Sequence, residues 1–451
     1  MDSHAPPSFG AAVRGISKVG RCYRARLVSI AADADFVGQV RCQLAPVPFF
    51  ANLRAGRWYV PNPDGLCHFK SSDGHPQERT KFSTSRLNLN VLSALQEAGS
   101  LCIVDATRRG KRFPDALSIT VPMWCAVINR LRAQSFDQAA EPGLFPEWVP
   151  LHEVDKIEAS IDGFCEDVLE VAPDILDIVR QLQHPIHPVW LAHGDLLPHC
   201  GPGSQQQPST SEYLVLWCLS ASEARGAEAA REHQSLTYVQ GAGDDEEAWS
   251  LGLTPSHFFA HRSELLASLA PEDLVPEILQ RQHEAPLLLA DQPTRILGTR
   301  LLLCSRAVEG PCIVLNQATG TSTTKTLQLR CPPAKRPKPP DAHLRAMQAL
   351  EAFLHEHEGP VVLVASTNED LPSLIFLSVL AIVLEGEGGG GGGGLGRVEK
   401  LHIRKALCKV ATVGVPPELP RHFMNEITRF CNSAPSRSTR SSTPQSGCHF
   451  E

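Results

Sequence analysis

The chain has 451 residues, enough for two or three domains, and 42% of them are hydrophobic and 20% charged, as in a folded globular protein. Its net charge of -7 excludes a general polycation, so any nucleic-acid surface must be a local patch. The 14 cysteines form no Cys-x-x-Cys pair, which argues against a zinc ribbon or a disulfide framework and favours free thiols in a reducing compartment.

The first part of the chain alternates predicted helices with predicted strands. Residues 1–15 are expected to form a loose tail without the apolar core of a signal peptide, and residues 24–55 hold mixed apolar segments. Hydrophobic spacing then predicts helices at 85–98, 118–134 and 155–183 and strands at 101–104 and 213–219. Gly99 can close the first of these helices, and Ser118 can cap the second. This order predicts an α/β fold.

The last part of the chain, beyond an expected boundary near 286–295, has the same character. Its predicted elements are strands at 300–304, 312–315 and 361–365 and helices at 343–357 and 371–384. The strongest apolar run, 374–384, is too short to span a bilayer and predicts a buried helix. The glycine run at 388–394 carries no fold signal, and the Ser/Thr/Arg tail from Ser433 is expected to be disordered.

A dense basic segment follows the strand at 101–104. The strand ends on Asp105, then Thr107, and the next cations are Arg108, Arg109, Lys111 and Arg112. Ligands of open α/β sheets bind beyond the carboxyl ends of the strands, so a carboxylate and cations placed there suit a metal-bound, multiply phosphorylated ligand. The alternative is a solvated basic turn. The segment has no GxxxxGK[ST] sequence, so it is not a P-loop.

Six segments, the basic one included, are dense in functional residue types. They are NLRAGRWY at 52–59, CHFKSSDGH at 67–75, FSTSRLN at 82–88, DATRRGKRFPDALS at 105–118, PMWCAVIN at 122–129 and YVQGAGDDEEAWSLGLTP at 238–255. In this order and spacing they resemble the initiator tRNA phosphoribosyl transferases, over residues 24–260 and more weakly to about residue 430. Two peripheral departures are Ala55, where a cysteine is expected, and the lack of an expected aromatic residue around 76–80.

The resemblance implies a reaction. It implies that the protein places a 2'-O-ribosyl phosphate on a T-stem purine of cytoplasmic initiator methionine tRNA, which excludes that tRNA from elongation. The implied donor is 5-phosphoribosyl 1-pyrophosphate, and a divalent metal, normally magnesium (Mg2+), is expected. Such a site must deprotonate a ribose hydroxyl, tolerate positive charge on the sugar and neutralise the leaving pyrophosphate.

The residues expected to bind the donor share cationic or hydroxyl groups near strand ends. Arginine forks hold phosphate bidentately, Gly110 lets the basic loop approach closely, and Ser220 and Ser222 resemble a helix N-terminal anion pocket. The donor set is Lys70, Ser71, Thr107, Arg108, Arg109, Gly110, Lys111, Ser220 and Ser222, with Arg112 as a further pyrophosphate ligand.

Three residues are expected to be catalytic. Asp73 or His75 is the expected general base, because either could take the hydroxyl proton near neutral pH; the alternative is an Asp-Gly turn with a structural histidine. Asp105 is expected to hold the metal or the ribose hydroxyls, or else to cap the following turn. Asp115 is either a cap or an ion-pair partner of the arginines.

Two sets of residues are expected to contact tRNA. The nearer set is Asn52, Arg54, Arg57 and Trp58, and the farther set is Lys335, Arg336 and Lys338 in the proline-rich segment 332–340. Cations beside aromatic rings suit a stacked base and its phosphate, although a tryptophan is more often a core residue. The proline-rich segment could instead be only a linker.

The expected magnesium ligands are the successive acids Asp244 and Asp245, which could instead belong to a solvated charged run. His193, His199 and Cys200 lie near an expected flexible loop. They are predicted to be surface residues and not a metal site.

The segment 361–384 resembles the strand–loop–helix of dual-specificity phosphatases. In that pattern the nucleophilic cysteine falls on Ala365 and the phosphate-binding arginine on Leu371, and Glu369 would repel an anion. We therefore expect a phosphatase-like scaffold with a degenerate P-loop and no phosphatase chemistry.

Together these patterns predict an N-terminal α/β transferase domain at 1–290, a C-terminal α/β phosphatase-like domain at 295–433 and a disordered tail at 434–451. The expected partners are initiator methionine tRNA and phosphoribosyl pyrophosphate, in the cytoplasm, with no membrane and no obligate protein partner. The alternatives are a non-catalytic RNA-binding protein that retains phosphate pockets and, less favoured, an RNA phosphatase.

Overall fold

The computed structural model describes residues 9–53, 55–70, 80–108, 110–195, 212–224, 238–281, 291–296, 298–306, 308, 310–315, 326–329, 342–365, 370–385, 398–413 and 421–433. Side chains of the first helix are described from Tyr23 onward. The chain divides into two compact units, Met1–Leu288 with Gly414–Pro416, and Leu289–Val413 with Pro417–Glu451.

The first unit is built on a five-stranded parallel sheet in the order β2-β1-β3-β5-β4. Its strands are β1 (Phe49–Asn52), β2 (Gly65–Cys67), β3 (Ser100–Asp105), β4 (Ile186–Leu191) and β5 (Leu214–Ser220). The chain steps from β1 to β2 on one side and returns to the other side of β1 for β3. The topological switch point therefore lies between β1 and β3, and ligands of such sheets bind beyond the strand ends at this point.

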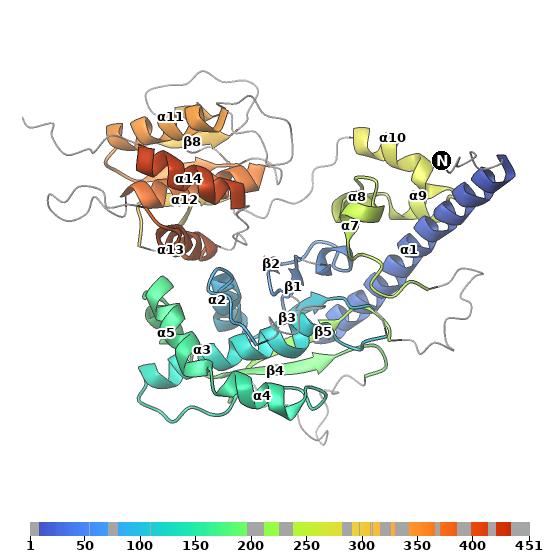
Figure 1. The fold of residues 1–451 in the computed structure, drawn as a ribbon, viewed down its shortest axis with the longest axis horizontal. Helices are drawn as coiled ribbons and strands as arrows, with labels where there is room; N and C mark the ends of the chain where they lie inside the picture. Colours follow the sequence, from blue (N-terminus) through green and yellow to red (C-terminus); the bar gives the residue numbers. More distant parts are fainter. Residues whose placement is uncertain are drawn as a thin grey trace, which may run out of the picture. The chain divides into compact units, whose positions relative to one another are not determined.

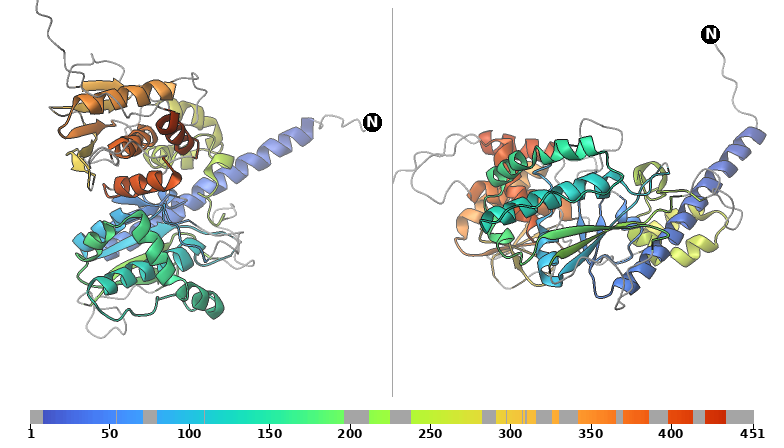
Figure 2. Two further views of the ribbon diagram at one scale, coloured as in Figure 1. Left: turned by 60° about the vertical axis from the view of Figure 1, so that its left-hand side comes forward. Right: turned by 90° about the horizontal axis from the view of Figure 1, so that it is seen from below.

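Helices cover both faces of this sheet (Figures 1 and 2). On one face the long helix α1 (Phe9–Leu44) shares a core with strand residues such as Val104 and Leu219. Strand side chains alternate, so Leu101 and Ile103 point to the opposite face. There α2 (Leu89–Ala98) contacts β3 and β5, and α3 (Val121–Ser135) contacts β4.

Helix α1 corrects two expectations for the start of the chain. One helix runs from Phe9 to Leu44, where the sequence predicted a loose tail at 1–15 and separate apolar segments at 24–55. The buried side chains that form its apolar stripe are Leu27, Ile30, Ala34 and Val37. Their spacing of three or four residues places them on one helix face. Charged residues between them break up the apolar runs, which hides the stripe.

The helix predicted at 85–98 begins later than expected. Helix α2 starts at Leu89, because Asn88 adopts a left-handed φ of 48° and its side chain accepts a hydrogen bond from the His68 amide. Gly99 closes the helix as predicted, at φ 72°, with its amide donating to the last turn.

Two other predicted helices are divided. Ser118 lies inside a short π-helical turn, η3 (Ala116–Thr120), so α3 begins at Val121 and Ser118 does not cap it. The helix predicted at 155–183 consists of α4 (Leu151–Glu158), α5 (Ile161–Val171) and α6 (Ile175–Val179). Pro173 prevents α5 from continuing, because proline has no amide hydrogen. The other short helices are η1 (Gly56–Trp58), α7 (Glu246–Trp249), α8 (Pro255–Ala260), α9 (Arg262–Ala267), η4 (Pro271–Leu274) and α10 (Val275–Gln280).

The second unit has its own five-stranded sheet, in the order β6-β7-β10-β8-β9. Its strands are β6 (Thr294–Arg295), β7 (Leu301–Cys304), β8 (Cys312–Leu315), β9 (Thr326–Leu329) and β10 (Val361–Val364), all parallel except β6. Its helices are α11 (Ala342–Glu356), α12 (Leu371–Glu385), α13 (Lys400–Ala411) and α14 (Arg421–Ser433). Helix α12 is buried along most of its length, as its apolar run predicts.

The strands and helices predicted between residues 300 and 384 match observed elements to within one residue at each end. The tail predicted at 434–451 lies outside the described residues. Both units are thus α/β with mainly parallel strands. No helix among the described residues is long and apolar enough to cross a membrane.

Candidate functional site

Buried polar side chains end the strands β1, β3 and β5, and those of β1 and β3 are hydrogen-bonded. Asn52, Asp105 and Ser220 end these strands, and all three are fully buried. The Asn52 amide donates to one Asp105 carboxylate oxygen at 2.8 Å, and the backbone amide of Ala106 donates to the other at 2.8 Å. The carboxylate is therefore fixed at the switch point with a donor on each oxygen.

Asn52 also ties this contact to the segment after β2. Its side chain donates to the Phe69 carbonyl at 2.9 Å and accepts from the Phe69 amide at 2.8 Å. The Asn52 side chain is therefore buried and holds two strand ends together, which disfavours the expected tRNA contact. Burial, and next the Asp105 carboxylate, raise the pKa of the nearby Cys67 thiol well above its usual value.

Trp58 is likewise an interior residue. It is 1% exposed, and its ring packs against Trp249 and Phe258. Its indole nitrogen donates to a Glu246 carboxylate oxygen at 2.9 Å. This burial favours the core interpretation of Trp58, since no face of a buried ring is available to a base.

The basic loop after β3 is gripped by the Gly-Asp loop 240–245. Arg108 pairs through Nε with Asp244 at 2.8 Å and through a terminal nitrogen with Asp245 at 2.5 Å. The Gln240 side chain accepts from the Gly110 amide at 2.7 Å and donates to the Lys111 carbonyl at 2.8 Å. These contacts join segments that lie more than a hundred residues apart in sequence.

Gly241 explains why this approach is possible. It adopts a φ of +62°, and a Cβ atom there would lie 2.5 Å from the Thr107 carbonyl oxygen. Only glycine permits both that backbone conformation and so close a contact.

Lys111 and Arg112, the other described cations of the loop, also form ion pairs. Lys111 contacts Asp115 at 3.1 Å, and Arg112 pairs with Asp195. Among the described residues Asp115 thus pairs with a lysine and not with one of the arginines, and its side chain makes no cap hydrogen bond to η3. The side chains of Lys111 and Arg112 are 45% and 51% exposed, so both cations are open to a phosphate. The Arg112–Asp195 pair contributes little stability, whereas the Asp115 side chain is only 8% exposed.

Three hydroxyl groups lie at the same edge. The Thr107 amide donates to the Ser222 hydroxyl at 3.4 Å. The Thr107 and Ser220 hydroxyls are buried, and neither has a hydrogen-bond partner among the described residues. Buried hydroxyls in that state are costly, so these two mark a place where the edge can accept further polar contacts.

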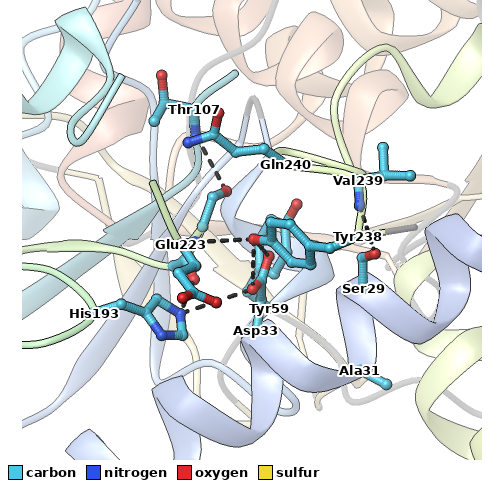
Figure 3. A network of polar contacts seen from close by, with 12 residues as sticks. Ser29, Ala31, Asp33, Tyr59, Thr107, His193, Glu223, Tyr238, Val239 and Gln240 are labelled. Atoms are coloured by element: carbon cyan, nitrogen blue, oxygen red, sulfur yellow. Dashed lines mark hydrogen bonds and ion pairs between the residues drawn. The ribbon is translucent and has the colours of Figure 1, made fainter. Parts of the chain in front are cut away.

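A polar network from α1 reaches this edge (Figure 3). Asp33, 1% exposed, accepts from the Tyr238 hydroxyl at 2.9 and 3.0 Å, and that hydroxyl accepts from the Glu223 amide at 2.9 Å. His193 Nε2 lies 3.8 Å from Asp33 and 2.8 Å from the Ala221 carbonyl. Burial, and next Asp33, raise the pKa values of Tyr238 and Tyr59 well above the usual tyrosine value, which keeps both hydroxyls protonated.

His193 lines a cavity of about 390 Å³ at the carboxyl end of β4. The other lining residues are Arg112, Ala192, Gly194, Glu223 and Ala224. His193 is more than the surface residue that the sequence predicted. Its ring stacks on Phe36, with ring centroids 3.7 Å apart, and its Nε2 faces Asp33. Its place just beyond a strand end was the available signal. Nothing in the sequence singled out Asp33, because a lone acidic residue in a helix is usually solvated.

The described acids do not fit the expected magnesium site. Arg108 already occupies both Asp244 and Asp245. Among the described residues no group of three or more His, Cys, Asp or Glu side chains is placed to hold a metal ion. Mg2+ is commonly held by one or two carboxylates plus substrate phosphates, so the phosphates of a donor would have to supply most of its ligands.

Several predicted site residues lie outside the described part of the chain. They are Arg54, Ser71, Asp73, His75, Arg109, Lys335, Arg336 and Lys338, together with His199, Cys200 and Glu369. Of the predicted site residues that are described, Lys70 is exposed and its carbonyl accepts from the Thr120 hydroxyl at 2.8 Å, and Arg57 is partly exposed.

Comparisons with known proteins point to one family. Residues 16–284 match the family model described as the Rit1 N-terminal domain. An uncharacterized protein of Schizosaccharomyces pombe is 35% identical over 306 residues, 65% of this chain and 64% of that protein. The tRNA A64-2'-O-ribosylphosphate transferase of Saccharomyces cerevisiae is 34% identical over 284 residues, 58% of this chain and 54% of that protein. The chain thus spans less than two thirds of the length of each relative, and no solved structure matches.

Proposed function

The chain belongs to the Rit1 family, and from this premise we propose that it transfers a 5-phosphoribosyl group from phosphoribosyl pyrophosphate to a ribose 2'-hydroxyl of tRNA. The observation that carries the proposal is the family match over residues 16–284, a range that contains the whole parallel sheet and its polar carboxyl edge. The finer acceptor in this proposal is a T-stem purine of initiator methionine tRNA in the cytoplasm, whose modification excludes it from elongation.

In the proposed reaction the donor lies along the carboxyl edge of the first unit. Its pyrophosphate binds the exposed side chains of Lys111 and Arg112, whose carboxylate partners are Asp115 and Asp195. Arg109, Lys70 and Ser71 extend the same anion site, and Arg108 and the Gly110 amide hold the basic loop beside it through Asp244, Asp245 and Gln240. The Thr107, Ser220 and Ser222 hydroxyls are close enough to the switch point to bind the donor's phosphate or ribose oxygens.

The chemical step is an inverting displacement at the anomeric carbon. The tRNA 2'-oxygen forms a bond to that carbon, the bond to the pyrophosphate oxygen breaks, and the hydroxyl proton passes to a general base. We assign the base to Asp73 or His75. Asp105, held by Asn52 and the Ala106 amide, is suited to orient the ribose hydroxyls.

Magnesium remains part of the proposal only as an ion that accompanies the donor. Asp244 and Asp245 do not fit it while Arg108 holds them, so no step above depends on the metal. Their proposed role in the absence of the donor is to hold Arg108 and the basic loop in place.

For the second unit we propose a phosphatase-like scaffold without phosphatase chemistry. The order of β10 and α12 supports the strand–loop–helix resemblance, and Ala365 and Leu371 replace the nucleophile and the phosphate-binding arginine. No obligate protein partner is proposed.

One experiment tests the proposed activity against its alternatives. The protein is incubated with phosphoribosyl pyrophosphate carrying a radiolabelled 5'-phosphate and with unmodified initiator tRNA, and elongator methionine tRNA is the control. We expect label in initiator tRNA. Binding of tRNA without transfer would favour a non-catalytic RNA-binding protein, and release of phosphate from RNA would favour a phosphatase.

A further inference from the structure

Beside the basic loop, the structure presents a tryptophan that is both fixed and half exposed. The Trp148 ring stacks on Phe113 with ring centroids 4.7 Å apart and an interplanar angle of 10°, and it meets Trp190 edge to face at 5.9 Å. Its indole nitrogen donates to the buried Ser118 hydroxyl at 3.1 Å. Even so, 49% of Trp148 is exposed.

The chain around Trp148 holds the ring rigidly. Trp148 sits in a tight turn closed by the hydrogen bond from the Val149 amide to the Pro146 carbonyl, and Val149 is buried. A large aromatic ring that is fixed in orientation but left half in solvent is an unusual surface feature, and such surfaces are common where a partner binds. Binding to a rigid ring costs little conformational entropy.

The charge next to the ring indicates what kind of partner binds. Phe113, the ring beneath Trp148, also carries the Arg112 guanidinium at 5.6 Å from its centroid. Arg112 is half exposed and lines the His193 cavity. The same arginine therefore lies beside the aromatic pair and belongs to the candidate phosphate site. An aromatic face beside an arginine is the combination that binds a nucleobase and its phosphate.

We propose that Trp148 is a stacking platform for an unpaired nucleobase of the acceptor RNA, with the adjoining phosphate on Arg112. This inference rests on the proposed function. The donor of that reaction has a ribose and phosphates but no base, so a stacking surface beside the anion site serves the acceptor. Sequence-selective RNA binding generally uses unstacked bases held on aromatic rings.

A protein partner is the competing occupant. Leu151, at the start of α4, is 79% exposed and could extend an apolar patch. The Arg112 guanidinium beside the ring favours RNA, because its side chain is 51% exposed and can bind a phosphate next to a stacked base, for which a purely apolar interface offers no equivalent.

The test measures tRNA binding without donor, so that no chemistry is needed. Trp148→Leu keeps apolar volume but removes the flat π surface, and it should weaken tRNA binding by roughly 5- to 100-fold. Trp148→Phe should restore most of the affinity. The dependence of affinity on salt should be unchanged in both variants, because stacking releases no counterions, whereas Arg112→Ala should flatten it by about one phosphate contact.

Phe136→Ala is the matched control. Phe136 is 42% exposed and carries the Arg132 guanidinium at 5.1 Å, the same kind of pair as at Trp148. Phe136 directly follows α3. Arg132, in the last turn of that helix, donates to the carbonyls of Leu182 and Gln183, just before β4 begins. The control residue therefore lies at the amino ends of the strands, away from the carboxyl edge. We expect Phe136→Ala to bind tRNA like the parent protein.

The outcomes separate this inference from the proposed function. If the parent protein and Trp148→Leu bind tRNA equally well, the stacking role of Trp148 is overturned and the proposed function is unaffected. Parent protein that does not bind tRNA would overturn both. A folded Trp148→Leu variant, checked by circular dichroism, whose oligomeric state changes while its tRNA affinity does not would assign the ring to a protein interface and overturn the inference.

Discussion

Residues at the carboxyl edge differ in how firmly their charges are held. Arg108 bonds two carboxylates, and the side chain of one of them, Asp244, is only 7% exposed. Lys111 bonds one carboxylate, that of Asp115, whose side chain is 8% exposed, but its own side chain is 45% exposed. Arg108 is therefore suited to fix the loop, and Lys111 has an open side on which it can bind a phosphate.

Lys111→Ala tests this division. It should raise the donor concentration needed for half-maximal transfer by roughly tenfold or more, the value of a charge-assisted hydrogen bond. Affinity for tRNA alone should change little. Donor titrations at saturating tRNA and a separate binding assay measure the two effects. Arg180→Ala, which removes an exposed pair with Asp177 on α6, is the control. Equal losses of donor and tRNA affinity would contradict the assignment.

Tyr238 gives a prediction about alkaline stability. Burial, and next the Asp33 carboxylate, raise its pKa in the folded protein above the unfolded value of about 10. Its contribution to stability is therefore complete below pH 10. Above pH 10 the unfolded tyrosine ionises first, so stability falls by about 1.4 kcal/mol per pH unit until the folded pKa is reached.

Tyr238→Phe should remove this part of the alkaline loss. At pH 8 the variant should be less stable than the parent, because it lacks the hydrogen bonds to Asp33 and Glu223. The difference in free energy of unfolding between the parent and the variant, measured by urea unfolding, should shrink between pH 10 and 11. The comparison with the parent cancels the contribution of buried thiols such as Cys218, whose pKa burial also raises. A difference that stays constant with pH would show that Tyr238 ionises as freely in the fold as in the unfolded chain.

At the scale of elements, the Gly-Asp loop and the basic loop act as one unit. Gly241→Ala should destabilise the protein by roughly 3 kcal/mol or more, because it adds both a strained φ and a contact of 2.5 Å with the Thr107 carbonyl. Gly99→Ala is the matched control. Gly99 has a φ of +72° with no described atom within 4 Å of the added Cβ, so only the strain of about 1–2 kcal/mol applies. Chemical unfolding measures both, and equal losses would mean that the close approach carries no cost.

Sequence periodicity was sufficient for β3, β5, β7, β8 and β10 and for the buried helix α12, since their apolar residues are continuous. It also placed Asp105 and the basic loop at a strand end. It did not find the other five described strands, β1, β2, β4, β6 and β9. It could not reveal that Asp244 and Asp245 bond Arg108, because that pairing depends on how distant loops meet. For the same reason it did not find the long helix α1 or its Asp33, whose function depends on what packs against them.

For the whole molecule, the family match ends at residue 284, near the point where the first compact unit ends. The anion site, the Trp148 platform and the proposed chemistry all belong to the first unit. The second unit has its own sheet and core, and its sequence adds the cations Lys335, Arg336 and Lys338, which lie outside the described residues. Its contribution to RNA binding is therefore a separate question from catalysis.

The triple variant of Lys335, Arg336 and Lys338 to alanine answers that question. The protein carries a net charge of -7, so its affinity for tRNA must come from concentrated cations and not from overall charge. If these three side chains bind phosphates, the variant should bind tRNA more weakly, and the slope of log affinity against log salt should flatten. The change should be about 0.7 for each single-stranded phosphate that the variant no longer neutralises, and somewhat more for duplex. Donor affinity should not change, because the proposed donor site lies in the first unit. Identical tRNA affinity at every salt concentration would show that the segment is only a linker and would confine RNA recognition to the first unit.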